Sequence, residues 1–316
     1  MNINKPNTFK EAEVISDNKI INLVLGFLGV FLISCFFESI IQFIAVFISL
    51  INKTSINEIL TIFEDSNALS ELIYGNNALL LIMLFSTICS IIVPILYCVK
   101  IEKRPISSMG IIKNNAFKTY FIGLIVGFLM ISSVVLLEIL TGNLEFNGLN
   151  NITLYLIVMI VLLFIGFAVQ SASEEVMMRG YFLTSMGAKN KVCTAIFLSA
   201  VIFSLIHIGN DGFSIIPFIN ITLIGIFFAL YYICFDNIWG VSAVHGMWNF
   251  AQGNIYGISV SGITMKNSIF KTTQVGNELF NGGSFGAEGG IITTAIIVIS
   301  LIILLCYMKK KGKILD

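Results

Sequence analysis

Apolar runs of similar length recur along the whole chain, and short polar segments separate them. Each run is close to the roughly 20 residues that a helix needs to cross a bilayer. We therefore expect an all-α fold, a polytopic membrane helical bundle of about eight transmembrane helices. The predicted spans, whose ends are fixed only to within a few residues, are 20–50, 78–99, 119–140, 152–182, 192–209, 214–235, 238–256 and 290–308.

The composition favours a membrane environment over an aqueous one. Hydrophobic residues make up 57% of the chain and charged residues only 11%, and the mean hydropathy is +0.94. Soluble domains carry about 25% charged residues, so this chain lacks the charge to cover a water-facing surface. The formal net charge is zero, which gives no electrostatic reason to expect a nucleic-acid partner. The lipid bilayer is the first partner that the sequence predicts.

The basic residues predict the orientation of the chain. With eight spans, fourteen Lys and Arg fall on one side and only three, Lys53, Lys266 and Lys271, on the other. Because Lys and Arg gather on the cytoplasmic side, we expect a multi-pass protein of the cell membrane with both termini in the cytoplasm. The predicted parts are a cytoplasmic tail (1–19), a single helical domain (20–308) and a basic cytoplasmic tail (309–316). The Gly-rich segment 257–289 is expected to be mobile and to lie on the opposite side.

One charged cluster interrupts the most apolar part of the chain, in the stretch SASEEVMMRGYF (171–182). An ionisable group inside a span costs about 2.5–3.5 kcal/mol on insertion scales. Glu175 and Arg179 have the i, i+4 spacing of a helical ion pair, with the acid on the N-terminal side. Glu174 points about 100° away around the helix and has no local partner in this prediction. It therefore needs a partner from elsewhere in the bundle.

Only two histidines are present in the chain, His207 and His245, and both fall in apolar segments. Counted from the turn near Lys189, Glu174 and His207 lie at similar depths, roughly 22 and 27 Å along antiparallel helices. His245 and Asn249 share one face of the 238–256 span, and His245 would lie only about 12 Å along it. We therefore expect Glu174 and His207 to lie at similar depths in the membrane and His245 to lie at a shallower depth.

A carboxylate, two imidazoles and an amide are the groups that amide hydrolysis needs. The reaction requires a base to activate water, a donor for the leaving nitrogen and donors for the oxyanion. Glu174 can act as the base and then as the acid, and His207 can position the water. His245 and Asn249 can donate to the oxyanion.

Three short motifs occur in order along the chain: E-E-x-x-x-R, F-x-x-x-H and H-x-x-x-N. They resemble the CPBP group, which comprises CAAX-type prenyl proteases and bacteriocin-processing intramembrane proteases and is also called the Abi family. The resemblance covers about residues 105–256, with the motif core at 170–250. The motif positions are Glu174, Glu175, Arg179, Phe203, His207, His245 and Asn249.

This resemblance implies an eight-helix fold and a glutamate-dependent intramembrane protease. It implies that Glu174 and His207 activate the water and that His245 and Asn249 stabilise the oxyanion. Glu175 and Arg179 would support the site, and Phe203 would pack beside His207. The expected cofactor is none, because the chain has no H-E-x-x-H helix. If the enzyme were metal-dependent, zinc would be the ion, and Glu174, His207 and His245 its ligands.

Several polar residues outside the motifs are interpreted without a catalytic role. Glu38 and Gln42, one turn apart, are expected to make polar contacts within the bundle. Glu138 lies near the end of a span and needs no special role. Met177 and Met178 are expected to pack in the core.

The predicted substrate is a peptide precursor or a membrane-associated protein. Leaders of secreted peptides such as bacteriocins, prenylated CAAX tails and membrane anchors are all open at this stage. Two other functions remain open: a non-catalytic membrane scaffold or bacteriocin self-immunity protein, and a proton-coupled transporter that relays protons through the Glu and His cluster.

Overall fold

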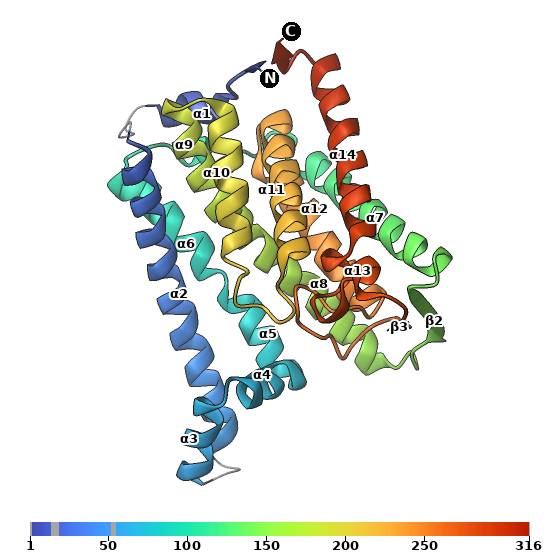
Figure 1. Cartoon of the computed structure of the whole chain (residues 1–316). Helices are drawn as coiled ribbons and strands as arrows, with labels where there is room; N and C mark the ends of the chain where they lie inside the picture. The colour runs from blue at the N-terminus through green and yellow to red at the C-terminus, as the bar shows by residue number, and fades with distance from the viewer. Residues whose placement is uncertain (1, 14–18, 52–54, 316) are drawn as a thin grey trace.

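The computed structural model describes residues 2–13, 19–51 and 55–315, and it consists of helices packed side by side (Figure 1). Residues 14–18 of the predicted N-terminal tail and Lys53 lie outside the described residues. Helices dominate the described chain, as predicted, and only two small sheets accompany them.

The N-terminal half begins with a two-residue strand and continues with helices of very different lengths. Its elements are β1 (Asn2–Ile3), α1 (Asn7–Ala12), α2 (Ile20–Ile51), α3 (Ile56–Glu64), α4 (Ser66–Gly75), α5 (Asn77–Ser86), α6 (Cys89–Leu96), the π-helix η1 (Tyr97–Ile101), the 3-10 helix η2 (Ile106–Met109), α7 (Ala116–Leu140) and β2 (Leu144–Leu149).

The C-terminal half contains the motif residues and two further π-helices, η3 and η4. Its elements are α8 (Leu154–Glu175), η3 (Val176–Leu183), α9 (Thr184–Lys189), α10 (Val192–Leu205), α11 (Ile215–Phe235), α12 (Ile238–Phe250), η4 (Ala251–Ile255), β3 (Phe270–Gln274), α13 (Glu278–Asn281), the 3-10 helices η5 (Gly283–Phe285) and η6 (Ala287–Gly289), α14 (Ile291–Lys310) and β4 (Ile314–Leu315).

Six continuous helical segments in the described chain are long and apolar enough to cross a membrane, so the predicted count of eight is not confirmed. They are Ile20–Ile51, Asn77–Ile101, Ala116–Leu140, Leu154–Lys189, Ile215–Phe235 and Ile291–Lys310. The other two predicted spans form the shorter helices α10, of 14 residues, and α12, of 13 residues. At 1.5 Å per residue α10 is about 21 Å long, and α12 together with η4, which continues it to Ile255, is about 27 Å long, both less than the roughly 30 Å of a hydrocarbon core.

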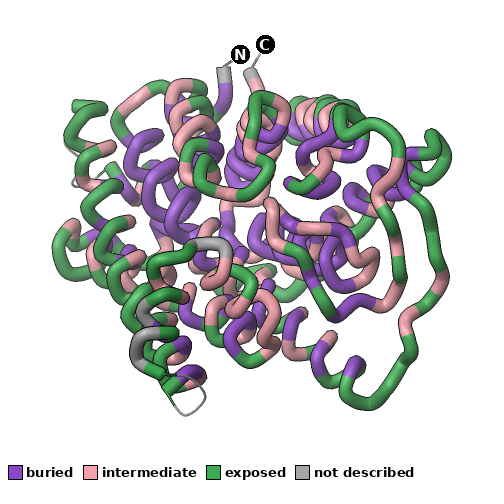
Figure 2. Tube along the Cα trace, turned by 60° about the horizontal axis from the view of Figure 1, so that its bottom comes forward, coloured by how far each residue is buried: buried purple, intermediate pink, exposed green. Residues whose placement is uncertain are grey.

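The short helix α12 lies at the centre of the bundle, where it packs against α7 and α8. Almost all its residues are buried. Two glycines of α7 let the backbones approach closely: a Cβ on Gly123 would lie 2.2 Å from the Gly240 carbonyl oxygen, and one on Gly127 would lie 2.3 Å from that of Val244. Small residues four apart on a helix allow this kind of close packing in membranes. The outer helix α2, by contrast, has many exposed apolar side chains. Figure 2 shows how buried, intermediate and exposed residues are distributed along the whole trace.

Two pairs of antiparallel strands join distant parts of the chain, and the sequence pattern did not predict them. β1 pairs with β4, so the two ends of the described chain lie at the same end of the molecule (Figure 1). β2 pairs with β3, with Leu144 opposite Gln274. This second pairing anchors the segment 257–289. The segment, expected to be mobile, instead folds into β3, α13, η5 and η6 and contributes buried side chains such as Phe285.

Candidate active site

Glu175 and Arg179 form the buried ion pair that their spacing predicts. Arg179 Nη1 lies 2.9 Å from Glu175 Oε1, and both side chains are completely buried. Arg179 Nη2 also donates to the Gly225 carbonyl oxygen at 3.2 Å. The guanidinium carbon lies 4.5 Å from the centre of the Phe203 ring, within the range of a cation–π contact. Arg179 of η3 thus contacts both α10, through Phe203, and α11, through Gly225.

His245 lies against both motif glutamates. This position is deeper in the bundle than the count of residues along its helix predicted. Its Nδ1 lies 2.9 Å from Glu175 Oε1, and its Nε2 lies 3.8 Å from Glu174 Oε2. Because a carboxylate only accepts hydrogen bonds, Nδ1 carries a proton. Glu175 therefore orients His245 as well as binding Arg179, a role that the sequence did not reveal.

The depth of His245 follows from where α12 begins. Asn237 caps this helix by accepting a hydrogen bond from Gly240 N, and it is only 5% exposed. Asp236, the residue before it, accepts hydrogen bonds from the backbone of Asn7 and Thr8. The turn before α12 is therefore covered by α1 instead of lying at the surface, and the whole helix is shifted into the bundle.

Glu174 has a partner on its own helix, contrary to the expectation that it had none. The side-chain amide of Gln170, one turn earlier, donates to Glu174 Oε1. Gln170 Oε1 in turn accepts a hydrogen bond from Asn249 Nδ2 at 3.4 Å. Gln170 thus connects the predicted base to the predicted oxyanion donor. Its position four residues before Glu174 was the sequence signal for this role.

His207 lies just after the end of α10, and its ring is oriented by Phe203, the first residue of the F-x-x-x-H motif. Nδ1 lies 2.8 Å from the Phe203 carbonyl oxygen, which can only accept, so Nδ1 donates. In the neutral imidazole Nε2 is then free to accept a proton or a hydrogen bond. The Phe203 ring packs edge-on against both imidazoles, with centroids 5.1 Å from His207 and 6.0 Å from His245.

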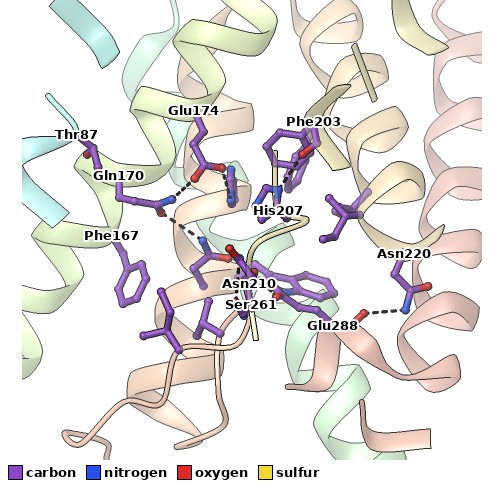
Figure 3. Close-up of a pocket in the computed structure, with 18 of the residues that line it drawn as sticks. Thr87, Phe167, Gln170, Glu174, Phe203, His207, Asn210, Asn220, Ser261 and Glu288 are labelled. Atoms are coloured by element: carbon purple, nitrogen blue, oxygen red, sulfur yellow. Dashed lines mark hydrogen bonds and ion pairs between the residues drawn. The ribbon is translucent and has the colours of Figure 1, made fainter. Parts of the chain in front are cut away.

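A cavity of about 240 Å³ brings together the four residues predicted to act on the substrate, Glu174, His207, His245 and Asn249. Figure 3 shows Glu174 and Gln170 on one helix and His207 and Phe203 facing them. Phe203 lines this catalytic cavity as well, whereas Glu175 and Arg179 lie behind its wall. Most of the remaining lining is apolar: Met83, Leu84, Phe167, Ile221, Ile224, Phe228, Val260, Ile263, Met265 and Ile297.

Glu288 is a second acidic residue of the catalytic cavity, and sequence reasoning missed it. It comes from the Gly-rich segment, in which NGGSFGAEGG contains no other charge. Its carboxylate accepts hydrogen bonds from Ser261 N at 2.9 Å, Ser261 Oγ at 2.7 Å and Trp248 Nε1 at 3.2 Å. Burial raises the pKa of Glu288, and the Ser261 hydrogen bonds act in the opposite direction. The carboxyl group fixes the segment over the cavity.

A second cavity, of about 260 Å³, adjoins the first between α2, α6, η3 and the end of α10. Thr87, Glu174, His207 and Asn210 line both cavities, so the predicted water-activating pair lies where they meet. Glu38 of α2 lines the second cavity, together with Ser90. Neither cavity has a Lys or Arg among the described residues that line it.

Glu174, His207 and His245 are the ligands expected if the enzyme were metal-dependent. The described residues contain no group of three His, Cys, Asp and Glu side chains placed to hold an ion. Nδ1 of each histidine is engaged by a protein acceptor, Phe203 O or Glu175 Oε1, which leaves only Nε2 of each ring for another partner. The use of zinc stays a prediction, and the chemistry proposed below is assigned to side chains of this chain.

Comparison with known proteins identifies the segment that carries this site. Residues 153–251 match the family model of the type II CAAX prenyl endopeptidase Rce1-like proteins. Neither the comparison with curated proteins nor the comparison with solved structures found a match. The matched residues include all seven motif positions. The match indicates a hydrolase of the protease class, and it confirms the resemblance of this multi-pass membrane protein to the CPBP-family intramembrane proteases.

Proposed function

We propose that this chain is an intramembrane endopeptidase that hydrolyses a peptide bond in a peptide precursor or a membrane-associated protein. The observation that carries the proposal is the convergence of Glu174, His207, His245 and Asn249 on one largely apolar cavity. These residues come from α8, α12 and the turn after α10, so they are distant in the sequence and meet only in the folded chain.

Glu174 and His207 supply the two acceptors that a nucleophilic water needs. The water is held between the Glu174 carboxylate and the free Nε2 of His207. Glu174 takes a proton from it, and the resulting hydroxide attacks the carbonyl carbon of the substrate. Glu174 then gives this proton to the leaving nitrogen as the C–N bond breaks, so the products are a carboxylic acid and an amine.

His245 and Asn249 supply the donors for the tetrahedral oxyanion. Asn249 Nδ2 has two hydrogens, and only one is used by Gln170. To donate through Nε2, His245 must carry protons on both ring nitrogens, because its Nδ1 proton is bound by Glu175. Glu175 and the nearby Glu174 oxygen provide negative charge on both sides of that imidazolium. Removing one oxyanion donor typically lowers kcat by about 10²–10³.

The charges around the two cavities favour an internal peptide bond over a free C-terminal tail. A substrate cut close to its C-terminus brings a carboxylate near the reacting atoms, and a buried carboxylate needs a cationic partner. The cavities carry Glu38, Glu174 and Glu288 and, among their described lining residues, no Lys or Arg; the His245 imidazolium is already held between Glu174 and Glu175. This supports a peptide precursor or a membrane anchor as the substrate.

The arrangement of the chain ends supports the predicted orientation. β1 and β4 pair, and Lys5 donates to the carbonyl oxygen of Ala188 in α9, just before the turn at Asn190. The N-terminal segment, this turn and the basic C-terminal segment thus lie at one end of the bundle. We propose that this end faces the cytoplasm of a multi-pass protein of the cell membrane.

Mass spectrometry of a peptide library tests the enzymatic proposal. The purified protein in lipid nanodiscs is incubated with the library in H₂¹⁸O, and hydrolysis is read as ¹⁸O in new C-termini. We expect Glu174→Gln to lower the cleavage rate by about 10²–10⁴, the range for loss of general acid–base catalysis. Glu138→Gln is the matched control, because Glu138 is a completely buried glutamate that does not line either cavity.

The two outcomes separate an enzyme from a scaffold. Cleavage by the wild type and by Glu138→Gln, but not by Glu174→Gln, supports the protease. Equal cleavage by Glu174→Gln and the wild type contradicts the assigned chemistry. If no cleavage occurs and Glu174→Gln still restores the phenotype of a host lacking the gene, the chain acts as a scaffold or an immunity protein.

A further inference from the structure

Glu38 carries a carboxyl group near the middle of α2, the least buried of the six long apolar helices of the described chain. Its neighbours along α2 are large apolar residues, of which Phe36 is 62% and Phe37 47% exposed. An ionisable residue inside a membrane helix is costly, and it faces a cavity or a partner when it is present. Glu38 does both: Ser90 Oγ of α6 donates to it, and it lines the second cavity.

The hydrogen bond to Ser90 does not by itself require a carboxyl group. One turn later, Gln42 Nε2 donates to Ser86 Oγ at 3.0 Å and joins α2 to the preceding helix α5. An amide thus makes the same kind of bridge at Gln42, which lines neither cavity. Helix packing alone would be served by glutamine at position 38, without the cost of burying a charge. The carboxyl group at position 38 is therefore explained by a ligand that binds a carboxylate and would not bind a glutamine.

The position of Glu38 relative to the reacting groups indicates where this ligand lies. Glu38, Glu174 and His207 line the same cavity of about 260 Å³. An extended peptide advances only about 3.3 Å per residue, so neighbouring residues of a substrate would lie beside these three side chains. A group bound by Glu38 would thus be close along the substrate to the bond that is cut.

We propose that Glu38 is a specificity residue that binds a cationic group of the substrate, a Lys or Arg side chain or a free amino group, within a few residues of the scissile bond. The inference rests on the proposed peptidase function. A cation complements a cavity that contains two carboxyl groups and, among its described lining residues, no Lys or Arg. The matched family segment, residues 153–251, does not include Glu38, so this recognition is a feature of the chain outside the catalytic motifs.

The test uses pairs of apolar peptides that differ only by Lys or Gln at one position, acetylated and amidated so that their ends carry no charge. Binding is measured by fluorescence anisotropy on Glu174→Gln protein in nanodiscs, which reports recognition without turnover. Cleavage of the same peptides is measured on the active protein. Breaking a buried charge pair costs at least about 2 kcal/mol, or roughly 30-fold. We expect a Lys preference of this order for one position, in both affinity and kcat/KM.

Variants at position 38 show whether the preference depends on the carboxyl group. Glu38→Gln should bind and cleave both peptides alike, with the ratio of their kcat/KM values falling to about one, whereas Glu38→Asp should retain the preference. Gln42→Ala is the matched control, since it removes a helix bridge without touching the cavity, and it should leave the ratio unchanged.

The outcomes distinguish this inference from the proposed function. A Lys preference that persists in Glu38→Gln, or its absence from an active wild-type enzyme, overturns the role of Glu38 and leaves the peptidase standing. If the protein with Glu174 intact cuts no peptide, but binding still shows a Lys preference that depends on Glu38, the cation site is supported and the peptidase is overturned.

Discussion

Arg179 offers the most quantitative test of how the site is held together. Its guanidinium is completely buried and makes an ion pair with Glu175, a hydrogen bond to Gly225 and a contact with the Phe203 ring. Arg179→Met keeps the apolar part of the side chain but leaves the Glu175 carboxylate without its cation. Removing one partner of a buried ion pair costs about 3–5 kcal/mol. This is a large part of the roughly 5–15 kcal/mol that stabilises a typical folded protein.

The double variant Glu175→Gln/Arg179→Met separates stability from activity. With both charges removed, no carboxylate remains unpaired at this position, so we expect most of the lost stability to return. A glutamine at position 175 could still accept the hydrogen bond from His245 Nδ1, but it would no longer supply negative charge beside the imidazole. Because the oxyanion role of His245 needs protons on both nitrogens, the double variant should be inactive even where its stability returns.

Unfolding in mixed micelles, followed by the fluorescence of the two tryptophans, measures these free energies. Glu13→Gln is the control, because Glu13 and Lys5 form an exposed pair at 3.0 Å, and such pairs contribute about 0–1 kcal/mol. If Arg179→Met lost no more stability than Glu13→Gln, or if the double variant were less stable than Arg179→Met, the account of this pair would be wrong.

Two further predictions concern packing and pH. Gly127→Ala should destabilise the protein by about 1–3 kcal/mol, typical of overpacking, because its Cβ would lie 2.3 Å from Val244 O. Gly29→Ala is the control and should not destabilise it, because no atom lies within 4 Å of its Cβ. Equal Tm values for the two variants would refute the close contact. The raised pKa of Glu288 means that its carboxyl group holds a proton more tightly in the folded state, so the stability it contributes is present at acid pH and lost as pH rises through that pKa. Glu288→Gln should therefore show a smaller fall in Tm from mildly acidic to mildly alkaline pH than the wild type, and parallel Tm curves would refute this.

Local spacing in the sequence was sufficient to predict the helical class and the pairing of Glu175 with Arg179. Both depend on neighbours within one or two helical turns, and period and spacing report such neighbours directly. The same rule also pointed to Gln170, four residues before Glu174, although its role was overlooked.

Features that depend on distant parts of the chain were not predictable in this way. The depth of His245 was misjudged because α1 covers the turn at Asp236, a contact between residues more than 200 positions apart. The place of Glu288 in the catalytic cavity depends on the pairing of β2 with β3, which no local pattern in the Gly-rich segment indicates. The predicted count of eight membrane-crossing helices is not confirmed, and hydropathy does not separate a helix buried among other helices from one that faces lipid.

The origin of the cavity walls has a consequence for how such a protein can change. The proposed reacting groups come from residues 153–251, whereas Glu38, Met83, Ser261 and Glu288 come from segments before and after this range. Substitutions in these flanking segments can alter which substrate is accepted without moving the atoms that break the bond. Exchanging α2 and the 257–289 segment between related chains should therefore transfer substrate preference while the hydrolytic chemistry is kept.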